Sequence, residues 1–526
     1  MDKQDNQNPL FRAQRTMINT MPVFLPTYKG MCAENKIKDI SLVKRCRKAC
    51  SWVVLGGVST QALRLVRILV LTPFFPPDQM GIWFLMVAIY GFLQEISDTG
   101  IRQALIQNRR GTETAYLHNA WLINLARNLI LIVILFFGAP LIAAAFARNF
   151  NPVQLQEILQ VSCLILLFDG LSSVSMVLLR KQLIFKPVAL AQVLANLVGL
   201  AAGLLLSWLT QSIKGLVWGE VICAALLCAF SYAIHPYRPR LKWNGPAARE
   251  LFGYGAIAYL VTLVDAVGTR LDLLLLGMIA LGGNDVGLYG LSMSLIIGPS
   301  FILSQLSISV GFPALSLVQK DMARVKRGAA EMIKATQLIA LPMFGVIFLL
   351  APDLVGILPE KYAGVGVAWR WLSLTGFSLV FLRQLTAPLY AINRVYWCVI
   401  RGILHIVLML LLFAPMYERW GLVGACWATG MTMAITTLFI GWVLLRELQW
   451  PLGQCWQDLS PLWRPITGGL LAMALMTAAM LAAGLNWSSG WPVRIAVTLF
   501  GTAVYAICCF RYYYMPLRKA HRLALS

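Results

Sequence analysis

The sequence predicts an all-α polytopic membrane protein: about fourteen transmembrane helices, arranged as two six-helix bundles related as parallel repeats, plus two extra C-terminal helices. Three observations lead to this prediction: a lipid-like composition, basic residues on one predicted side of the membrane, and an internal repeat. Of the 526 residues, 59% are hydrophobic and 13% are charged, and the mean hydropathy is +0.71. This composition excludes an ordinary soluble domain.

Apolar runs of about 20 residues are long enough to cross the bilayer core as helices. The runs that meet this criterion lie at 51–74, 81–96, 120–146, 155–179, 188–209, 213–234, 251–280, 286–315, 332–351, 363–391, 395–415, 421–445, 465–485 and 491–510. No segment before the first run has the pattern of a signal peptide, so we expect the first span to direct membrane insertion.

Lys and Arg concentrate in every second gap between the apolar runs. Ten precede the first run, and others cluster after runs two, four, six and eight. Basic residues mark the cytoplasmic side of a membrane protein, so we expect both termini to be cytoplasmic. The basic residues in the external gaps are Arg148, Lys214, Lys361 and Arg419. The net charge of +22 therefore reflects topology, and we expect no nucleic-acid partner.

The first six spans resemble the next six at an offset near 206 residues. Asp169 to Ser172 matches Thr375 to Ser378, Gly215 to Val217 matches Gly421 to Val423, and Arg67 corresponds to Arg270. Six spans per half give both halves the same orientation, so we expect parallel repeats with a cavity at their interface, opened alternately to each side by rocking. The expected segments are a cytoplasmic tail (1–50), a first bundle (51–234), a cytoplasmic linker (235–250), a second bundle (251–445), a cytoplasmic loop (446–464), helices thirteen and fourteen (465–510) and a cytoplasmic tail (511–526).

Several arginines fall inside predicted spans, where a charge costs about 2.5 to 3.5 kcal/mol on insertion scales unless it faces protein or water. We predict that six of them bind substrate: Arg64, Arg67, Arg127, Arg270, Arg383 and Arg401. A cavity lined by guanidinium groups favours an anionic passenger that presents phosphate or carboxylate oxygens. The structural alternative is that some of these arginines only snorkel or pair with an acid.

Four acids lie in or near the same spans: Asp98, Glu220, Asp265 and Asp272. The sequence leaves two roles open for them, as counter-ions of the arginines or as a site for H⁺ or Na⁺ coupling. His405 is interpreted as a structural residue. No metal-ligand cluster or nucleophile motif occurs, so we expect no cofactor and no enzymatic activity.

Short motifs add a family resemblance that covers about residues 55–510. They are Pro76 to Gly81, Asp98 to Gly100 with Ala104 to Gln107, Arg270-Leu271-Asp272, and Val286 to Tyr289. In this order and spacing the chain resembles the polysaccharide transporter, or Wzx-type oligosaccharide flippase, family of the multidrug/oligosaccharidyl-lipid/polysaccharide (MOP) exporter superfamily.

The resemblance implies a bacterial inner-membrane protein that moves an undecaprenyl-pyrophosphate-linked oligosaccharide from the cytoplasmic to the periplasmic leaflet. It implies a role in O-antigen (lipopolysaccharide), capsule or exopolysaccharide synthesis, with the polymerase and other proteins of the glycan pathway as partners besides membrane lipids. A more distant similarity to lipid II flippases implies, by position, that Arg64, Arg67 and Arg270 meet the pyrophosphate.

Two other functions are compatible with parts of the sequence. A multidrug and toxin extrusion antiporter shares the two-bundle architecture, but it typically needs twelve spans and a cavity lined with acids for organic cations. A membrane-embedded glycan polymerase or ligase needs a large external loop for its catalytic groups, whereas the external gaps here are all shorter than about fifteen residues. We therefore favour the flippase.

Overall fold

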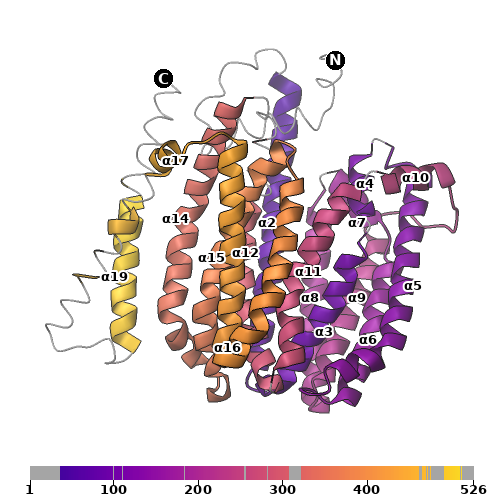
Figure 1. The fold of residues 1–526 in the computed structure, drawn as a ribbon. Coiled ribbons are helices and arrows are strands. Elements are labelled where there is room, and N and C mark those ends of the chain that lie inside the picture. The colour runs from indigo at the N-terminus through magenta and orange to yellow at the C-terminus, as the bar shows by residue number, and fades with distance from the viewer. Residues whose placement is uncertain are drawn as a thin grey trace.

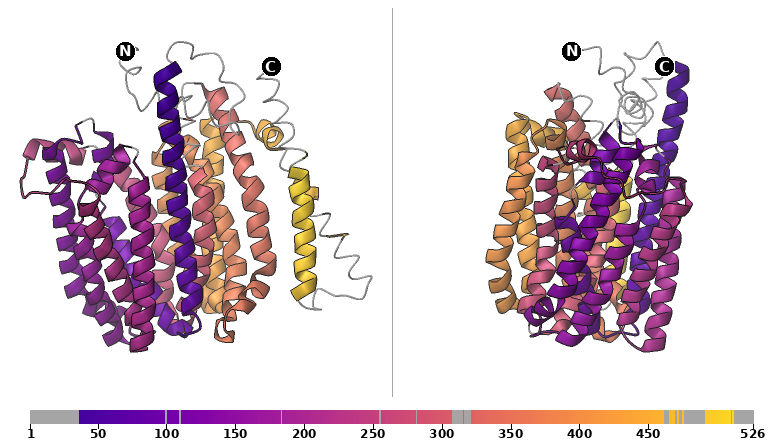
Figure 2. Two further views of the ribbon diagram at one scale, coloured as in Figure 1. Left: turned by 180° about the vertical axis from the view of Figure 1, so that it is seen from behind. Right: turned by 90° about the vertical axis from the view of Figure 1, so that its right-hand side faces the viewer.

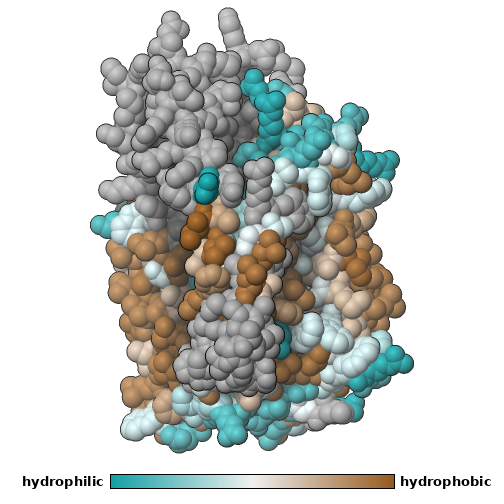
Figure 3. Space-filling view, turned by 90° about the vertical axis from the view of Figure 1, so that its left-hand side faces the viewer, coloured by the Kyte–Doolittle hydropathy of each residue, from teal (hydrophilic) through white to brown (hydrophobic). Residues whose placement is uncertain are grey.

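Long helices running in roughly the same direction make up nearly all of the described chain (Figure 1). This computed structural model describes residues 36–98, 100–108, 110–182, 184–253, 256–280, 282–306, 315, 321–460, 465–468, 471, 474–475, 491–509 and 511. Within these ranges, nine helices are long and apolar enough to cross a membrane. The space-filling view shows hydrophobic side chains around the middle of the molecule and hydrophilic ones at both ends, as a bilayer requires (Figure 3).

The helices of the first half follow the first six predicted spans. They are α2 (Lys36–Leu71), α3 (Pro77–Ile96), α5 (Thr114–Ala145), α6 (Pro152–Leu171), α8 (Lys186–Thr210) and α9 (Lys214–Ala233). Proline lies in the first turn of α3, α6 and α8, where its missing N–H removes no helical hydrogen bond. Short helices α4 (Ile101–Gln107) and α7 (Ser175–Lys181) connect them.

Two boundaries in this half differ from the prediction. Helix α2 begins at Lys36 rather than at 51, because a helix can continue into water beyond the apolar part that the hydropathy pattern detects. The predicted fourth span ends at Leu171, and α7 is a separate helix. The Ser173 amide between them donates to the Ser231 hydroxyl of α9 at 2.8 Å, a bond to another helix in place of a partner within the same helix.

The second half contains α11 (Ala256–Ile279), α12 (Gly283–Leu306), α14 (Met322–Leu354), α15 (Gly364–Ala391), α16 (Tyr396–Glu447) and, further along the chain, α19 (Trp491–Cys509). Residues 251–253 of the predicted seventh span belong to α10 (Gly245–Gly253), which packs on α4 and α5, and the rest of the described span is α11. Most of the predicted thirteenth span lies outside the described residues, and so do residues 307–314 of the predicted eighth span. The number of fourteen transmembrane helices therefore stays a prediction.

Helix α16 holds the predicted eleventh and twelfth spans, which are two helices joined at Gly421. Gly421 has φ 57° and ψ −138°, a backbone conformation that a residue with a Cβ rarely adopts. A Cβ on Gly424 would lie 1.8 Å from the Met416 carbonyl oxygen, so the chain reverses tightly here. The turn leaves no room for an external loop between these two spans.

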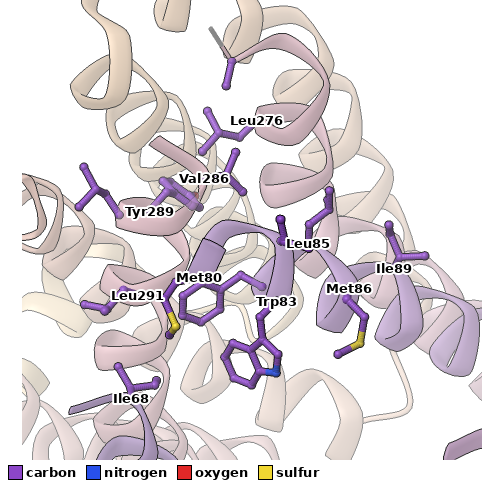
Figure 4. Packing of buried hydrophobic residues seen from close by; sticks show 14 of the residues in the cluster. Ile68, Met80, Trp83, Leu85, Met86, Ile89, Leu276, Val286, Tyr289 and Leu291 are labelled. Carbon is purple, nitrogen blue, oxygen red and sulfur yellow. The ribbon is translucent and has the colours of Figure 1, made fainter. Parts of the chain in front are cut away.

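Neighbouring helices pack mostly within their own half of the chain. In the first half α5 packs on α6, α8 on α9 and α2 on α8; in the second, α15 packs on α14, α12 and α16. Figure 2 shows the two halves beside each other, with α2 in front. Helix α3 is different, because its main neighbours are α11 and α12 of the second half. Its Leu85 side chain lies toward Leu276 of α11 and Val286 of α12, whereas Trp83 points to the other side of α3 (Figure 4).

The two ends of the bundle are chemically distinct. We call the end with α4, α7, α10 and α17 (Leu452–Leu459) the basic side, since Arg102, Arg180 and Arg249 lie there (Figure 1). It is the side predicted to be cytoplasmic. The other end, where α2 ends and α3 and α12 begin, is called the opposite side.

Glycines bring α3 and α12 into backbone contact on the opposite side. A Cβ on Gly287 would lie 1.7 Å from the carbonyl oxygen of Pro77, and a Cβ on Gly81 would lie 2.5 Å from that of Gly283. A Cβ on Gly290 would meet the Phe84 ring at 2.5 Å. The α3–α12 seam is the name used here for Pro77, Gly81, Phe84, Gly283, Gly287 and Gly290.

Hydrogen bonds between the halves surround the seam. The Tyr362 hydroxyl donates to the Phe75 carbonyl at 2.8 Å, and the Lys361 ammonium donates to the Pro73 carbonyl at 3.1 Å. The Asn149 amide donates to the Gly277 carbonyl at 2.8 Å. The two halves are therefore joined on the opposite side.

Candidate functional site: a cavity between the two halves

A cavity of about 380 Å³ lies between α2, α3, α6 and α9 of the first half and α11 and α12 of the second. Phe84 and Gly290, which belong to the α3–α12 seam, also line it, so the seam borders the cavity on the opposite side. Its charged lining residues are Arg64, Arg67, Asp169, Glu220, Arg270 and Asp272. Three of the six predicted substrate arginines thus meet here, including the pair related by the internal repeat.

Arg64 and Arg67 lie one turn apart on α2, which places them on the same helix face. Arg67 forms an ion pair with Glu220, and its guanidinium carbon lies 4.9 Å from the centre of the Trp83 ring. Arg64 is exposed to the cavity, and in the described part of the chain no carboxylate lies within ion-pair distance of it. Arg64 is therefore the guanidinium most available to an anion.

Arg270 enters the cavity from α11 and crosses to the first half. Its Nη2 lies 3.0 Å from a carboxylate oxygen of Glu95 on α3. A Cβ on Gly91 would lie 3.0 Å from the guanidinium carbon of Arg270, so this glycine makes room for the arginine. The Nε atoms of Arg67 and Arg270 are buried and have no hydrogen-bond partner among the described residues. Both arginines thus keep a donor that a ligand can use.

Asp272 is a buried carboxylate with no salt bridge to any described residue, and 5% of its surface is exposed. It accepts hydrogen bonds from the Tyr289 hydroxyl and from the Leu273 amide, each at 2.8 Å. The Tyr289 hydroxyl lies 2.9 Å from the Thr429 hydroxyl, so the contact continues from α11 through α12 to α16.

The cavity lining carries three guanidinium groups and three carboxyl groups. The sequence predicts an excess of cations here; the structure instead gives Arg67 and Arg270 acidic partners, and only Arg64 has none in the described part of the chain. An anion entering the cavity has one free guanidinium to meet first. It can then bind the guanidinium groups of Arg67 and Arg270 by displacing their partners Glu220 and Glu95.

A second cavity, of about 200 Å³, lies in the first half towards the basic side. It contains the predicted residues Arg127 and Asp98, whose closest charged atoms are 3.9 Å apart. Arg127 also lies 3.5 Å from a carboxylate oxygen of Asp169, a residue that lines both this cavity and the central one. We call this second cavity the N-half pocket.

Arg383, Arg401 and Asp265 meet in a third cavity, of about 30 Å³, within the second half. Asp265 forms an ion pair with Arg401, and its other oxygen lies 3.8 Å from Arg383. His405 lines the same cavity and is 4% exposed. The predicted residues Arg383, Arg401 and Asp265 thus come together, but they do not line the central cavity.

We predict that Arg401→Ala destabilises the protein rather than removing a substrate contact. The Arg401 side chain is 9% exposed, and its removal leaves Asp265 with only the 3.8 Å contact to Arg383, so we expect the free energy of unfolding to fall by about 3 kcal/mol, the lower end of the range for a broken buried pair. Unfolding of the purified protein in detergent measures this effect. Arg324→Ala, which breaks an exposed pair with Asp321, is the matched control, with an expected change below about 1 kcal/mol. Equal stability of Arg401→Ala and the control would contradict a structural role.

The structure adds residues to which the sequence assigns no role. Trp83 faces Arg67 across the cavity, Glu95 holds Arg270, and Tyr289 holds Asp272. An aromatic residue in an apolar span carries no pattern that indicates its contacts. Tyr289 ends the Val286 to Tyr289 motif, but that motif indicates the family and not a hydrogen bond to Asp272. Glu95, an acid at a span end, was identifiable as a candidate partner, but only the fold brings it to Arg270.

Comparison with known sequences identifies related proteins. A family model described as "Polysaccharide biosynthesis protein" matches residues 70–364. The teichuronic acid biosynthesis protein TuaB of Bacillus subtilis (strain 168) is 20% identical over 458 residues, which cover 85% of this chain and 90% of TuaB. The succinoglycan biosynthesis transport protein ExoT of Rhizobium meliloti (strain 1021) is 24% identical over 342 residues, which cover 64% of this chain and 66% of ExoT.

Comparison with solved structures identifies the fold. The lipid II flippase MurJ in an inward closed conformation superposes with a TM-score of 0.68 at 16% identity, over 88% of this chain and 100% of MurJ. An inward-facing multidrug resistance MATE family transporter of the MOP superfamily superposes with a TM-score of 0.61 at 13% identity, over 83% of this chain and 99% of that one. The all-helical transporter fold expected from the sequence is confirmed.

Proposed function

The chain belongs to the polysaccharide biosynthesis protein family matched by that model, and from this membership we propose that it is a flippase for an undecaprenyl-pyrophosphate-linked oligosaccharide. The observation that carries the proposal is Arg64, which has no ion-pair partner among the described residues and lies in a cavity that both halves line, beside Arg67 and Arg270. Pyrophosphate presents several anionic oxygens, and guanidinium groups bind such oxygens in pairs. The names of relatives and neighbours agree: ExoT is a transport protein and MurJ a lipid II flippase.

Binding proceeds in two steps in this proposal. The pyrophosphate first meets Arg64, and it then replaces Glu220 at Arg67 and Glu95 at Arg270, gaining charge-assisted hydrogen bonds as each carboxylate is released. The buried Nε donors of both arginines supply further contacts. The polyprenyl tail stays in the bilayer, where burial of its apolar surface costs nothing.

Transport then requires the halves to part on the opposite side. Rocking of one half against the other opens such a cavity alternately to each face, and here the α3–α12 seam and the hydrogen bonds around it have to separate. We place the protein in the bacterial inner membrane with both termini cytoplasmic, on the positive-inside rule. Loading therefore occurs from the basic side, and no catalytic step is involved.

Coupling to H⁺ or Na⁺, if transport uses it, is assigned to Asp272. Asp265 is held between Arg383 and Arg401, and Asp98 and Glu220 each lie beside an arginine. Asp272 has only neutral partners, and an unpaired buried carboxylate is costly when ionised, which favours its binding a cation.

A MATE-type antiporter for organic cations is the second candidate, because the MATE fold is shared. The arrangement of charges favours the flippase. The carboxylates Glu220 and Glu95 are engaged by arginines, whereas the free charge at Arg64 repels a cationic passenger.

We expect deletion of the gene to cause accumulation of lipid-linked oligosaccharide confined to the cytoplasmic leaflet, because synthesis continues without transfer. An impermeant lectin applied to intact and to inverted vesicles measures the leaflet. Complementation with the wild-type gene is the control and restores exposure on the periplasmic face. Normal export without accumulation, in a strain with no redundant flippase, would contradict the proposal and direct the next test to dye efflux.

A further inference from the structure

The N-half pocket differs in chemistry from the central cavity that it adjoins. Helices α4 to α9 of the first half all contribute to it. Its polar lining residues are Asp98, Arg102, Asn124, Arg127, Asp169, Ser172, Ser173, Arg180 and Gln192. The residues that line it include no aromatic side chain and mix donors with acceptors. The other seven lining residues are apolar. The polar groups suit a ligand with many hydroxyl groups, because buried polar groups need hydrogen-bond partners.

The pocket and the central cavity share a wall. Asp169, Ser172 and Leu227 line both. The two cavities therefore adjoin at the end of α6, so a ligand whose anionic group lies at Arg64 has the N-half pocket beside it. The pocket also lies towards the basic side, from which we propose that substrate loads.

The charged groups of the pocket retain hydrogen-bonding capacity. Arg102 contacts both carboxylate oxygens of Asp169 at 3.2 Å, and this pair is partly exposed. Arg127 lies farther from its acids, at 3.5 and 3.9 Å, and its buried Nε has no partner among the described residues. A carboxylate accepts and a guanidinium donates, so an adjacent pair of them matches vicinal hydroxyls, each of which does both.

We propose that the N-half pocket binds the first sugar of the passenger through its hydroxyl groups, while the arginines of the central cavity hold the pyrophosphate. This assignment rests on the proposed flippase function. It divides recognition into two parts: the arginines accept any pyrophosphate-linked lipid, and the pocket selects for the sugar attached to it. A volume of about 200 Å³ is suited to one sugar ring rather than to a long glycan.

The test uses the full-length protein in nanodiscs and four lipid probes. The probes are bare undecaprenyl pyrophosphate and the same lipid carrying one glucose, one galactose or one N-acetylglucosamine. The variants are Gln192→Leu and Arg102→Gln, both at pocket residues, and the matched control is Asn196→Leu, one turn further along α8 and outside the lining of either cavity. Thermal unfolding verifies that each variant is folded.

We expect wild type to bind at least one glycosylated lipid about tenfold or more tightly than the bare lipid. Each pocket variant is expected to reduce that ratio about fivefold, as the loss of one net hydrogen bond of about 1 kcal/mol implies, and Asn196→Leu is expected to preserve it. A wild-type protein without sugar preference, or folded pocket variants with the full wild-type ratio, would overturn the sugar site and leave the pyrophosphate site standing. Failure of wild type to bind any of the four lipids would overturn the flippase function itself.

Discussion

Arg64→Gln is expected to abolish glycan export while leaving the protein folded and inserted. Arg64 has no ion-pair partner among the described residues, so its removal strands no buried carboxylate and costs little stability. The passenger loses charge-assisted hydrogen bonds worth about 1.5 to 3 kcal/mol each, which is a tenfold to hundredfold loss of affinity per bond. Lectin exposure on intact cells measures export, and binding of undecaprenyl pyrophosphate in nanodiscs measures affinity.

Further variants test the reason for that loss. Arg64→Lys is expected to retain part of the activity, since an ammonium keeps the charge but lacks the paired donors of a guanidinium. Arg148→Gln, at an exposed residue that lines neither the central cavity nor the N-half pocket, is the control and should export normally. Arg67→Ala and Arg270→Ala are each expected to impair export as well. Full export by the variant that carries both substitutions would contradict binding of the pyrophosphate by these arginines.

Gly287→Ala is expected to block export by preventing closure on the opposite side. The new Cβ would lie 1.7 Å from the carbonyl oxygen of Pro77, an overlap that only separation of α3 and α12 relieves. Overpacking of a close contact costs about 1 to 3 kcal/mol, which penalises the closed arrangement and favours the state open to the opposite side. The carrier then spends less time in the state that loads substrate.

Cys223, which lines the central cavity and is buried, serves as a native reporter of this shift. An impermeant maleimide added from the periplasmic side is expected to label Cys223 in Gly287→Ala much faster than in the wild type. The same measurement in a Cys223→Ser background gives the labelling of the other cysteines, which is subtracted from the total. Gly345→Ala, where an added Cβ meets nothing within 4 Å, is the matched glycine control. Unchanged labelling together with normal export in Gly287→Ala would show that the seam is not an obstacle to transport.

The sequence predicts the helices well because a bilayer imposes length and hydropathy on each span. The repeat also pairs Arg67 with Arg270 across 203 positions, and the structure brings both to one cavity. The sequence does not show which neighbour a buried side chain faces, because that depends on the rotation of each helix about its axis in the bundle. Hence Arg383 and Arg401, which also fall inside predicted spans, lie in a separate cavity around Asp265.

The sequence misplaces two helix ends, one where a helix continues into polar sequence and one where a helix stops before the apolar run does. Residues 36–50 are charged and so give no transmembrane signal, yet they extend α2. The apolar residues after Ser173 give such a signal, yet a hydrogen bond to Ser231 ends the span. Hydropathy measures affinity for lipid, whereas helix ends are decided by local hydrogen bonds.

The balance of three guanidinium and three carboxyl groups in the cavity lining also bears on how the carrier resets after release. Once the passenger has left, Glu220 and Glu95 can return to Arg67 and Arg270, so that both arginines again have a carboxylate partner within the protein. Each elementary charge moved through the membrane potential costs or yields about 2.3 kcal/mol per 100 mV. We therefore expect the return of the empty carrier to be nearly independent of voltage, so that the electrical work of the cycle falls on the step that carries the anionic lipid.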